Sequence, residues 1–305
     1  MGVFLWVCLL QVFVPAPIGD KSGTTSPSLW PAPRVAARYA VDLVAAACAS
    51  LLVTPVIAAV DRAIVENTAN VSTIRASLRA SLQMACRTPL QFVRHRAFMW
   101  TAGLYGATYA AANAIDTSCE WAATDARLLK FAGCTPVNMA LVLQKDVVFS
   151  RMFGANRGVS GAVSGTIPPF PRASLGLFAV RDAHTVLAAF LLPPVIGAWL
   201  HDHGYVSSKP RGELIAQLAA PCVIQAISTP YHILALDLFN RPRVFTRPGT
   251  EETRYFPPQP TRWQVIRQKY AVTVAARMGR ILPAFGVGGV ANRHVRQSLA
   301  TALQV

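Results

Sequence analysis

The feature of this 305-residue chain that most constrains its fold is a succession of long apolar stretches separated by short clusters of arginine. Apolar residues make up 53% of the chain and charged residues only 14%, whereas roughly a quarter of the residues in an ordinary soluble domain are charged. So few charges cannot cover the surface of a soluble globule. The sequence therefore predicts an all-α membrane protein whose surroundings are a lipid bilayer.

Six of the stretches can cross a hydrocarbon core of roughly 30 Å as helices, because each helical residue adds about 1.5 Å. They lie at roughly 39–60, 92–115, 131–149, 173–200, 214–239 and 272–292. Pro193 and Pro194 remove backbone donors, so we expect a kink in the fourth helix. Residues 1–37, rich in Pro and Ser, predict a disordered lead-in or targeting segment before a six-helix transmembrane bundle over residues 38–300.

Loop charge predicts how the bundle is oriented, because Lys and Arg accumulate in loops that are not translocated. The loops after the first, third and fifth spans are strongly basic, whereas those after the second and fourth are neutral or slightly acidic. Both termini are therefore expected on the side opposite the basic loops. The net charge of +15 does not indicate a nucleic-acid-binding protein, because the arginines lie between apolar stretches and not along one face.

Two sets of markers indicate that the helix pairs are repeats of one unit. An acidic residue lies near the end of each odd span and a basic residue near the start of each even span: Asp61, Asp146 and Asp237, and Arg94, Arg181 and Arg277. The acidic markers are separated by 85 and 91 residues, and the basic markers by 87 and 96. We therefore expect three helix-pair repeats, at about 38–115, 128–200 and 212–300.

Amphipathic segments at 72–86 and 261–274 follow the first and fifth spans, on two of the basic loops. In the first of them, Ile74, Leu78 and Leu82 share one helical face, while Arg75 and Arg79 share another. Both segments predict short helices that lie on the membrane surface.

Three units of an odd span, a surface helix and an even span, with a proline near the end of the odd span in the first and third units, resemble the mitochondrial carrier family. The resemblance covers roughly residues 38–300, and its closest local matches are VTPVIAAVDR, ISTPYHILALDLFNR and RMGRILPAFGVGGVANRHVR. It implies a six-helix solute carrier in the mitochondrial inner membrane, with both termini in the intermembrane space. The stretches KDVVFSRMFG and LFAVRDAHTVLAAFLLPP are also similar to an uncharacterised group of eukaryotic mitochondrial membrane proteins.

One departure from the carrier pattern concerns the ion pairs that close carriers on one side. Carriers place an acidic residue two positions after the helix-ending proline, where this chain has Ile57 after Pro55 and His232 after Pro230. The usual gating network is therefore absent. Either a different network closes the bundle, or the protein is a non-transporting membrane scaffold or assembly factor.

Ionisable groups in the spans are the candidate site, because each costs a few kcal/mol near the bilayer centre and so faces a cavity or a partner. The candidate substrate-binding residues are Lys145, Arg181, Asp182, His184, Asp237 and Arg280, with the amides of Asn113 and Asn292. Arg181 and Arg280 are expected to bind an anionic group. Lys145 and Asp146 are neighbours whose side chains point about 100° apart, so such pairs are expected to bond across helices, and such bonds alone could hold the bundle together.

No motif indicates catalysis: the chain has no nucleotide-binding glycine loop, no G-x-S-x-G and no H-E-x-x-H. We expect no catalytic residue, no metal site and no cofactor. The predicted function is transport of a small anionic or zwitterionic solute across the mitochondrial inner membrane, with the scaffold or assembly factor as the alternative.

Overall fold

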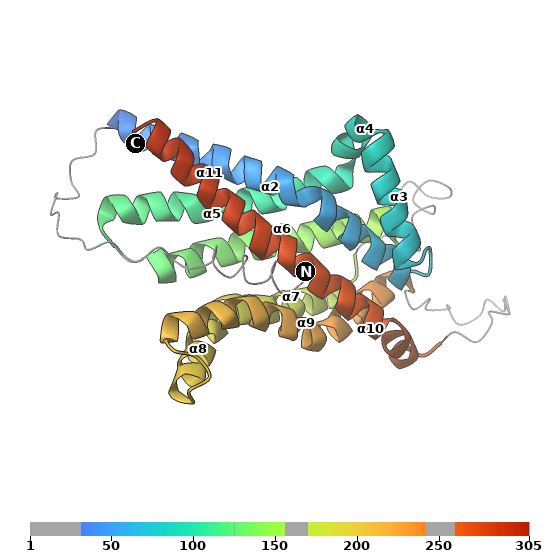
Figure 1. The fold of residues 1–305 in the computed structure, drawn as a ribbon. Coiled ribbons are helices and arrows are strands. Elements are labelled where there is room, and N and C mark those ends of the chain that lie inside the picture. The colour runs from blue at the N-terminus through green and yellow to red at the C-terminus, as the bar shows by residue number, and fades with distance from the viewer. Residues whose placement is uncertain (1–31, 125, 156–169, 242–259, 305) are drawn as a thin grey trace, which may run out of the picture.

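A computed structural model describes residues 32–124, 126–155, 170–241 and 260–304, and every regular element in these ranges is helical. Six long helical segments follow one another (Figure 1): α2 (Ala32–Thr68), α5 (Arg96–Ala122), α6 (Ala126–Phe153), α7 (Arg172–Val186) with η3 (Leu187–Leu191) and α8 (Leu192–Asp202), α9 (Lys209–Asn240), and α10 (Arg262–Ile281) with η4 (Leu282–Val287) and α11 (Gly288–Ala302). Each segment contains most or all of one predicted span. The predicted all-helical class is therefore confirmed.

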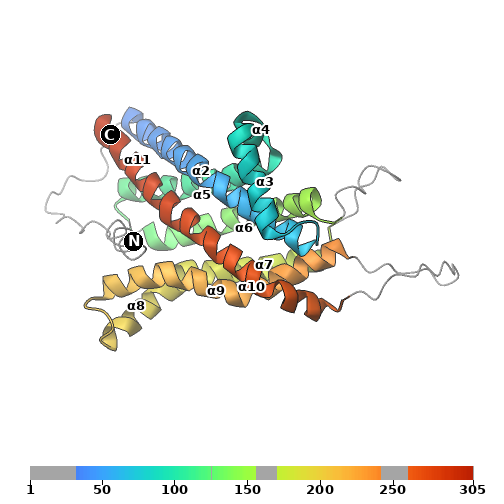
Figure 2. The same ribbon diagram turned by 45° about the vertical axis from the view of Figure 1, so that its right-hand side comes forward.

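The six segments form a closed ring in which each contacts the next along the chain. The last segment returns to the first, because α10 and α11 both pack on α2. Figures 1 and 2 show α2 and α11 side by side, with the beginning of α2 and the end of α11 at the same end of the bundle. Helix α2 also contacts α6 and α9, so the middle of the ring is filled by packed side chains.

The outward and inward faces of the long helices differ in the way expected of helices in lipid. Along α2, Leu43 and Leu52 are 62% and 56% exposed, whereas Asp42 and Thr54 are buried. By length and composition, Pro33–Thr68 and Lys209–Asn240 can each cross a membrane, and the bent pair Arg172–Ala189 and Leu192–Asp202 adds a third candidate if it is one span. An apolar exterior around a polar interior marks a membrane-embedded protein.

Prolines bend the helices and free carbonyl groups, one of which a tyrosine side chain then bonds. The two halves of the fourth segment meet at 41° beside Pro193 and Pro194, as predicted, after the π-helical turn η3. In α9, Pro230 has no N–H for the carbonyl of Ala226, and that oxygen instead accepts a hydrogen bond of 3.0 Å from the Tyr270 hydroxyl of α10. This tyrosine bond ties two helices together without leaving a bare polar group in lipid.

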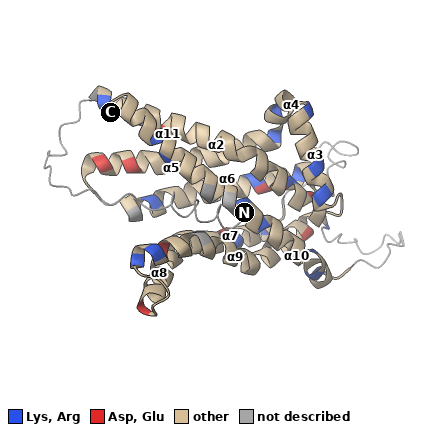
Figure 3. Cartoon of the chain, in the orientation of Figure 1, with Lys and Arg blue, Asp and Glu red and all other residues tan. Residues whose placement is uncertain are grey.

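The first predicted surface helix is present. Helix α3 (Ile74–Arg87) begins at Thr73, whose hydroxyl accepts a 3.3 Å hydrogen bond from the Ala76 N–H, and short α4 (Pro89–Arg94) follows it. The α3 face that meets α2 is made of serines, and the Ser77 hydroxyl donates to Glu66 at 2.5 Å. Leu82 is 65% exposed on the outside. Figure 3 shows Lys and Arg gathered on α3, on α4 and at the beginning of α10.

The second predicted surface helix is not a separate element, and that part of the prediction is wrong. The segment forms the first turns of α10, which continues through η4 into α11 without a break. Its sequence has no proline or glycine between Arg262 and Arg277, so nothing stops the helix there.

The predicted lead-in and several predicted loop charges lie largely outside the described residues. Helix α2 begins at Ala32, six residues before the predicted boundary, and residues 1–31 are not among those described. Arg157, Arg243, Arg247 and Arg254 of the basic loops are not described either.

Candidate functional site

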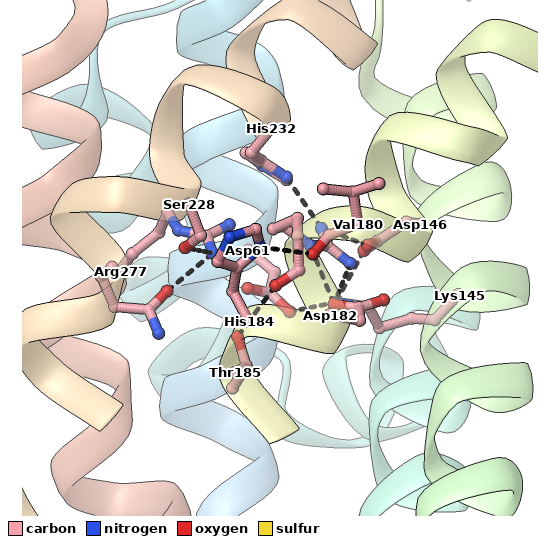
Figure 4. Close-up of polar contacts among 12 residues, drawn as sticks. Asp61, Lys145, Asp146, Val180, Asp182, His184, Thr185, Ser228, His232 and Arg277 are labelled. Carbon is pink, nitrogen blue, oxygen red and sulfur yellow. Dashed lines mark hydrogen bonds and ion pairs between the residues drawn. The ribbon is translucent and has the colours of Figure 1, made fainter. Parts of the chain in front are cut away.

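Buried ionisable side chains from five of the six segments meet in one place, which we call the central cluster. Its members are Asp61 of α2, Lys145 and Asp146 of α6, Arg181 and Asp182 of α7, His232 of α9, and Arg277 and Arg280 of α10. Figure 4 labels six of these residues and shows their side chains directed toward a shared centre: Asp61, Lys145, Asp146, Asp182, His232 and Arg277. Apart from Arg280, whose side chain is 20% exposed, each of them is no more than 7% exposed.

Asp61 joins three helices at the cluster. One carboxylate oxygen of Asp61 pairs with the Lys145 ammonium of α6, and the other accepts a 2.6 Å bond from Arg280 of α10. Removal of this carboxylate would leave Arg280 without its ion pair and Lys145 with Asp146 alone, inside a largely buried network.

Arg181 occupies the middle of the network. Its guanidinium contacts Asp146 of α6 at 2.6 Å and the Nδ1 atom of His232 of α9 at 2.8 Å. It also donates from Nε to Asp182, its chain neighbour, at 2.8 Å. The five-donor fork of arginine allows one side chain to bond three partners on three helices.

The expectation that chain neighbours pair across helices is only half right. Lys145 bonds Asp61 across helices, but its ammonium also lies 3.0 Å from the Asp146 carboxylate beside it. Arg181 likewise contacts the carboxylate of Asp182, its chain neighbour, at 2.6 Å. Their long side chains bend toward the neighbouring residue, so a 100° angular separation on the helix does not keep the charged ends apart.

Arg277 differs from the other cations of the cluster. It is 2% exposed, and its Nη2 atom donates to the side-chain oxygens of Gln225 at 2.6 Å and Ser228 at 3.1 Å, both on α9. Its Nε atom is buried without a hydrogen-bond partner, and among the described residues no carboxylate lies within 4.0 Å of its guanidinium. A buried guanidinium held only by neutral groups is costly, so this position favours an anion.

Cationic side chains outnumber carboxylates in the central cluster. Lys145, Arg181, Arg277 and Arg280 are balanced only by the three aspartates of the cluster. One oxygen of Asp182, Oδ2, also lacks a hydrogen-bond partner in the described part of the chain. The cluster therefore has one excess positive charge and, separately, a free carboxylate oxygen.

The space inside the cluster is small in this conformation. Asp61, Asp146, His232, Arg277 and Arg280 line a cavity of about 10 Å³, which is room for about one water molecule. Two larger hollows, of about 260 and 310 Å³, lie against Trp100 but are lined mainly by apolar side chains. The charged centre is thus closed.

Two predicted site residues lie outside the central cluster. Asp237 is buried near the end of α9, where it pairs with Arg241 at 2.6 Å and with Arg262, at the beginning of α10, at 3.1 Å. His184 donates from its ring to the Val180 carbonyl of its own helix at 2.7 Å and stacks on Tyr231. Neither residue contacts a charged member of the central cluster within the described chain.

The predicted amides join helices elsewhere. Asn113 of α5 and Asn292 of α11 exchange two hydrogen bonds of 2.9 and 2.7 Å. They lie beside a second polar group, which we call the end cluster and which consists of Arg38, Asp42, Thr117, Glu120 and Arg296. These contacts assign the amides a role in helix packing.

Five members or partners of the cluster are not among the site residues predicted from sequence: Asp61, Gln225, Ser228, His232 and Arg277. Asp61 and Arg277 are predicted only as repeat markers. A signal for His232 exists in the sequence. Asp61, Asp146 and His232 are separated by 85 and 86 residues, a more even spacing than that of the predicted marker Asp237. His232 thus lies in the cluster at nearly the spacing that separates the two aspartates.

No group of three or more His, Cys, Asp or Glu side chains in the described ranges could hold a metal ion. The chemistry available at the cluster is the binding of charged and hydrogen-bonding groups in a dry interior.

One known family matches the chain. The model of the family described as "Probable citrulline exporter" matches residues 45–300, from within α2 to the end region of α11. No curated protein and no solved structure matches. The match gives no support for membership of the mitochondrial carrier family, which remains a resemblance. Because the matched region contains the whole central cluster and most of the chain, the protein belongs to the probable citrulline exporter family.

Proposed function

We propose that the protein carries a zwitterionic amino acid, citrulline or a close analogue, across a membrane through the ring of six helical segments. The observation that carries the proposal is the central cluster itself. It places buried cations and carboxylates from five segments around one point, inside a protein whose family is described as exporters.

The chemistry of the cluster fits such a solute. Citrulline has a carboxylate, an ammonium group and a neutral, hydrogen-bonding ureido group. The cluster supplies cations for the carboxylate, the free Oδ2 of Asp182 for the ammonium, and the amide and hydroxyl of Gln225 and Ser228 nearby. Each charged group of the solute would thus exchange water for a partner of opposite sign.

The closed cluster is the occluded state of the proposed transport cycle. Asp61 bonds α2 to α6 and α10, so opening toward either side requires its pairs with Lys145 and Arg280 to separate. A bound solute that contacts those charges better in an open state shifts the population toward that state. The prolines and π-helical turns at η3 and η4 supply places where the helices bend.

The membrane arrangement is part of the proposal. All six segments cross the bilayer as three helix-pair repeats, and the even spacing of Asp61, Asp146 and His232 supports this. The location is the mitochondrial inner membrane, with both termini on the side opposite the basic loops. The resemblance to carriers and the alternation of loop charge support the location and the orientation.

The alternative is a non-transporting scaffold with the same bundle. The small volume of the cavity, about 10 Å³, and the tight pairing around Asp61 and Arg181 are the observations that favour it. A scaffold would keep the ion pairs closed permanently.

Uptake by liposomes that contain the purified full chain separates the two functions. The panel consists of radiolabelled citrulline, other amino acids, carboxylates, nucleotides and phosphate, with an Arg181→Gln variant and an Arg262→Gln control outside the cluster. We expect uptake of citrulline that Arg181→Gln loses and Arg262→Gln retains. Failure of a folded, inserted protein to take up any solute would support the scaffold.

A further inference from the structure

Arg277 is the one cation of the central cluster that has no carboxylate among the described residues. Lys145, Arg181 and Arg280 each form at least one ion pair with Asp61, Asp146 or Asp182. Arg277 instead has two neutral partners on α9, and its Nε atom is buried with none. It also lines the cavity, so the unsatisfied guanidinium borders the space at the centre of the cluster.

The neutral partners fix the orientation of this guanidinium. Gln225 is itself held by a 2.9 Å bond from its Nε2 atom to the carbonyl of Pro221, so the acceptor presented to Arg277 is not free to rotate. Ser228 accepts from the same Nη2 atom at 3.1 Å. With both N–H groups of Nη2 held by α9, the guanidinium is preorganised, and its Nε–H group remains to donate to a carboxylate.

The excess positive charge of the cluster determines which solutes it accepts. The four cations and three carboxylates of the cluster leave one positive charge uncompensated. A solute with a net positive charge would add a second uncompensated charge to a dry interior, where like charges repel strongly. A net-neutral zwitterion adds none and places its carboxylate where one is missing.

We infer that Arg277 binds the carboxylate of the transported solute, oriented by Gln225 and Ser228, and that the excess positive charge of the central cluster excludes cationic amino acids. The inference rests on the proposed function for the identity of the solute. It goes further in naming the residue that recognises the carboxylate and the class of amino acid that the site rejects. Figure 4 shows Arg277 and Ser228 on one side of the cluster and Lys145 and Asp146 on the other.

The test is equilibrium binding of radiolabelled citrulline to the purified full chain in detergent, which requires no transport. Two unlabelled competitors probe the two parts of the inference. Citrulline amide lacks the carboxylate and therefore has one net positive charge. Arginine has the same net charge but keeps the carboxylate and nearly the shape of citrulline, so the difference between the two competitors reports the carboxylate. For the wild-type protein we expect both to compete at least about 30-fold more weakly than citrulline.

The decisive variant is Arg277→Gln, because glutamine keeps a polar group that can still bond Gln225 and Ser228. We expect its affinity for citrulline to fall at least about 30-fold, and its preference for citrulline over the amide to disappear. Arg277→Lys keeps the charge but loses the planar guanidinium. It should therefore retain part of the citrulline affinity and part of the preference for citrulline over the amide. Arg262→Gln, which removes a charge outside the cluster, serves as the matched control and should bind as the wild type does.

The outcomes separate this inference from the proposed function. An Arg277→Gln protein that binds citrulline normally, or still prefers it to the amide by the wild-type factor, overturns the inference even if liposomes take up citrulline. Wild-type protein that binds no citrulline overturns it as well. Binding that depends on Arg277, in protein that transports nothing, upholds the carboxylate site and rejects transport.

Discussion

The central cluster and the end cluster are built from the same kinds of residue but differ in how completely their carboxylates are paired and in their charge balance. They lie near opposite ends of α2, since Asp42 and Asp61 are 19 residues, or about 28 Å, apart along the helix. In the end cluster both oxygens of Asp42 and both of Glu120 have partners, and two arginines balance two acids. In the central cluster Asp182 Oδ2 has none, and four cations are balanced by only three carboxylates.

The two clusters also connect different helices. The end cluster joins only α2, α5 and α11, so it fastens neighbouring elements. The central cluster joins five segments of the ring and borders a cavity. A charge-balanced network whose carboxylate oxygens are all paired stabilises one packing arrangement, whereas one with an excess cation and a spare carboxylate oxygen is suited to a ligand that completes it.

The largest expected effect follows from Asp61→Asn. The change leaves Lys145 and Arg280 without a shared carboxylate, and loss of one partner from a buried ion network costs about 3–5 kcal/mol. We expect a clear drop in the thermal midpoint in detergent together with loss of citrulline binding. Asp237→Asn is the matched control, a buried carboxylate with two arginines outside the cluster, and it should destabilise the protein without changing citrulline affinity.

Arg296→Gln tests the role of the end cluster. Arg296 bonds Asp42 at 2.6 Å, Thr117 at 2.8 Å and Glu120 at 3.2 Å, and loss of such charged hydrogen bonds costs about 2 kcal/mol. Thermal unfolding should show the loss, while the dissociation constant for citrulline stays unchanged. A change of affinity as large as that of Arg277→Gln would remove the distinction between the clusters.

A smaller effect is expected from Asn113→Ala, because it leaves the Asn292 amide buried with one partner fewer. The cost is about 1–2 kcal/mol. The double variant with Asn292→Ala should cost less than the two single changes together, since no amide is then left unpaired. Strictly additive midpoints in this double-mutant cycle would show that the pair does not couple α5 to α11.

The smallest effect is expected from His184→Ala. Its ring bonds a carbonyl of its own helix and stacks on Tyr231, and such replacements outside a core usually change stability by less than about 0.5 kcal/mol. Citrulline binding and uptake should match the wild type. A loss of binding would extend the site beyond the central cluster, as the sequence had predicted.

The fold was predictable from sequence because apolar length and loop composition are local properties. Each predicted span lies largely within one of the six helical segments, and the kink at Pro193 follows from the chemistry of proline. The continuation of α10 into α11 was missed because amphipathicity shows which face of a helix is apolar but not whether the helix stops.

The site was only partly predictable, because pairing depends on which helices meet. Lys145, Arg181, Asp182 and Arg280 were selected since charges in spans need partners, and they do converge. Asp237 has the same sequence signal, but it lies beside Arg241 and Arg262 and is paired there. Arg277 could not be distinguished from the other arginines, because its lack of a carboxylate partner is a property of the packed structure alone.

The measurement that tests the central claim most directly is the accessibility of one cysteine in each cluster. On a background in which the six native cysteines are replaced, Ser228→Cys marks the central cluster and Thr117→Cys the end cluster. Proteoliposomes are treated with a membrane-impermeant thiol reagent from either side, with and without citrulline. We predict that Ser228→Cys reacts from both sides and that citrulline protects it, whereas citrulline does not change the reaction of Thr117→Cys. A Ser228→Cys protein that stays unreactive from both sides, or that citrulline fails to protect, would contradict a solute path through the central cluster.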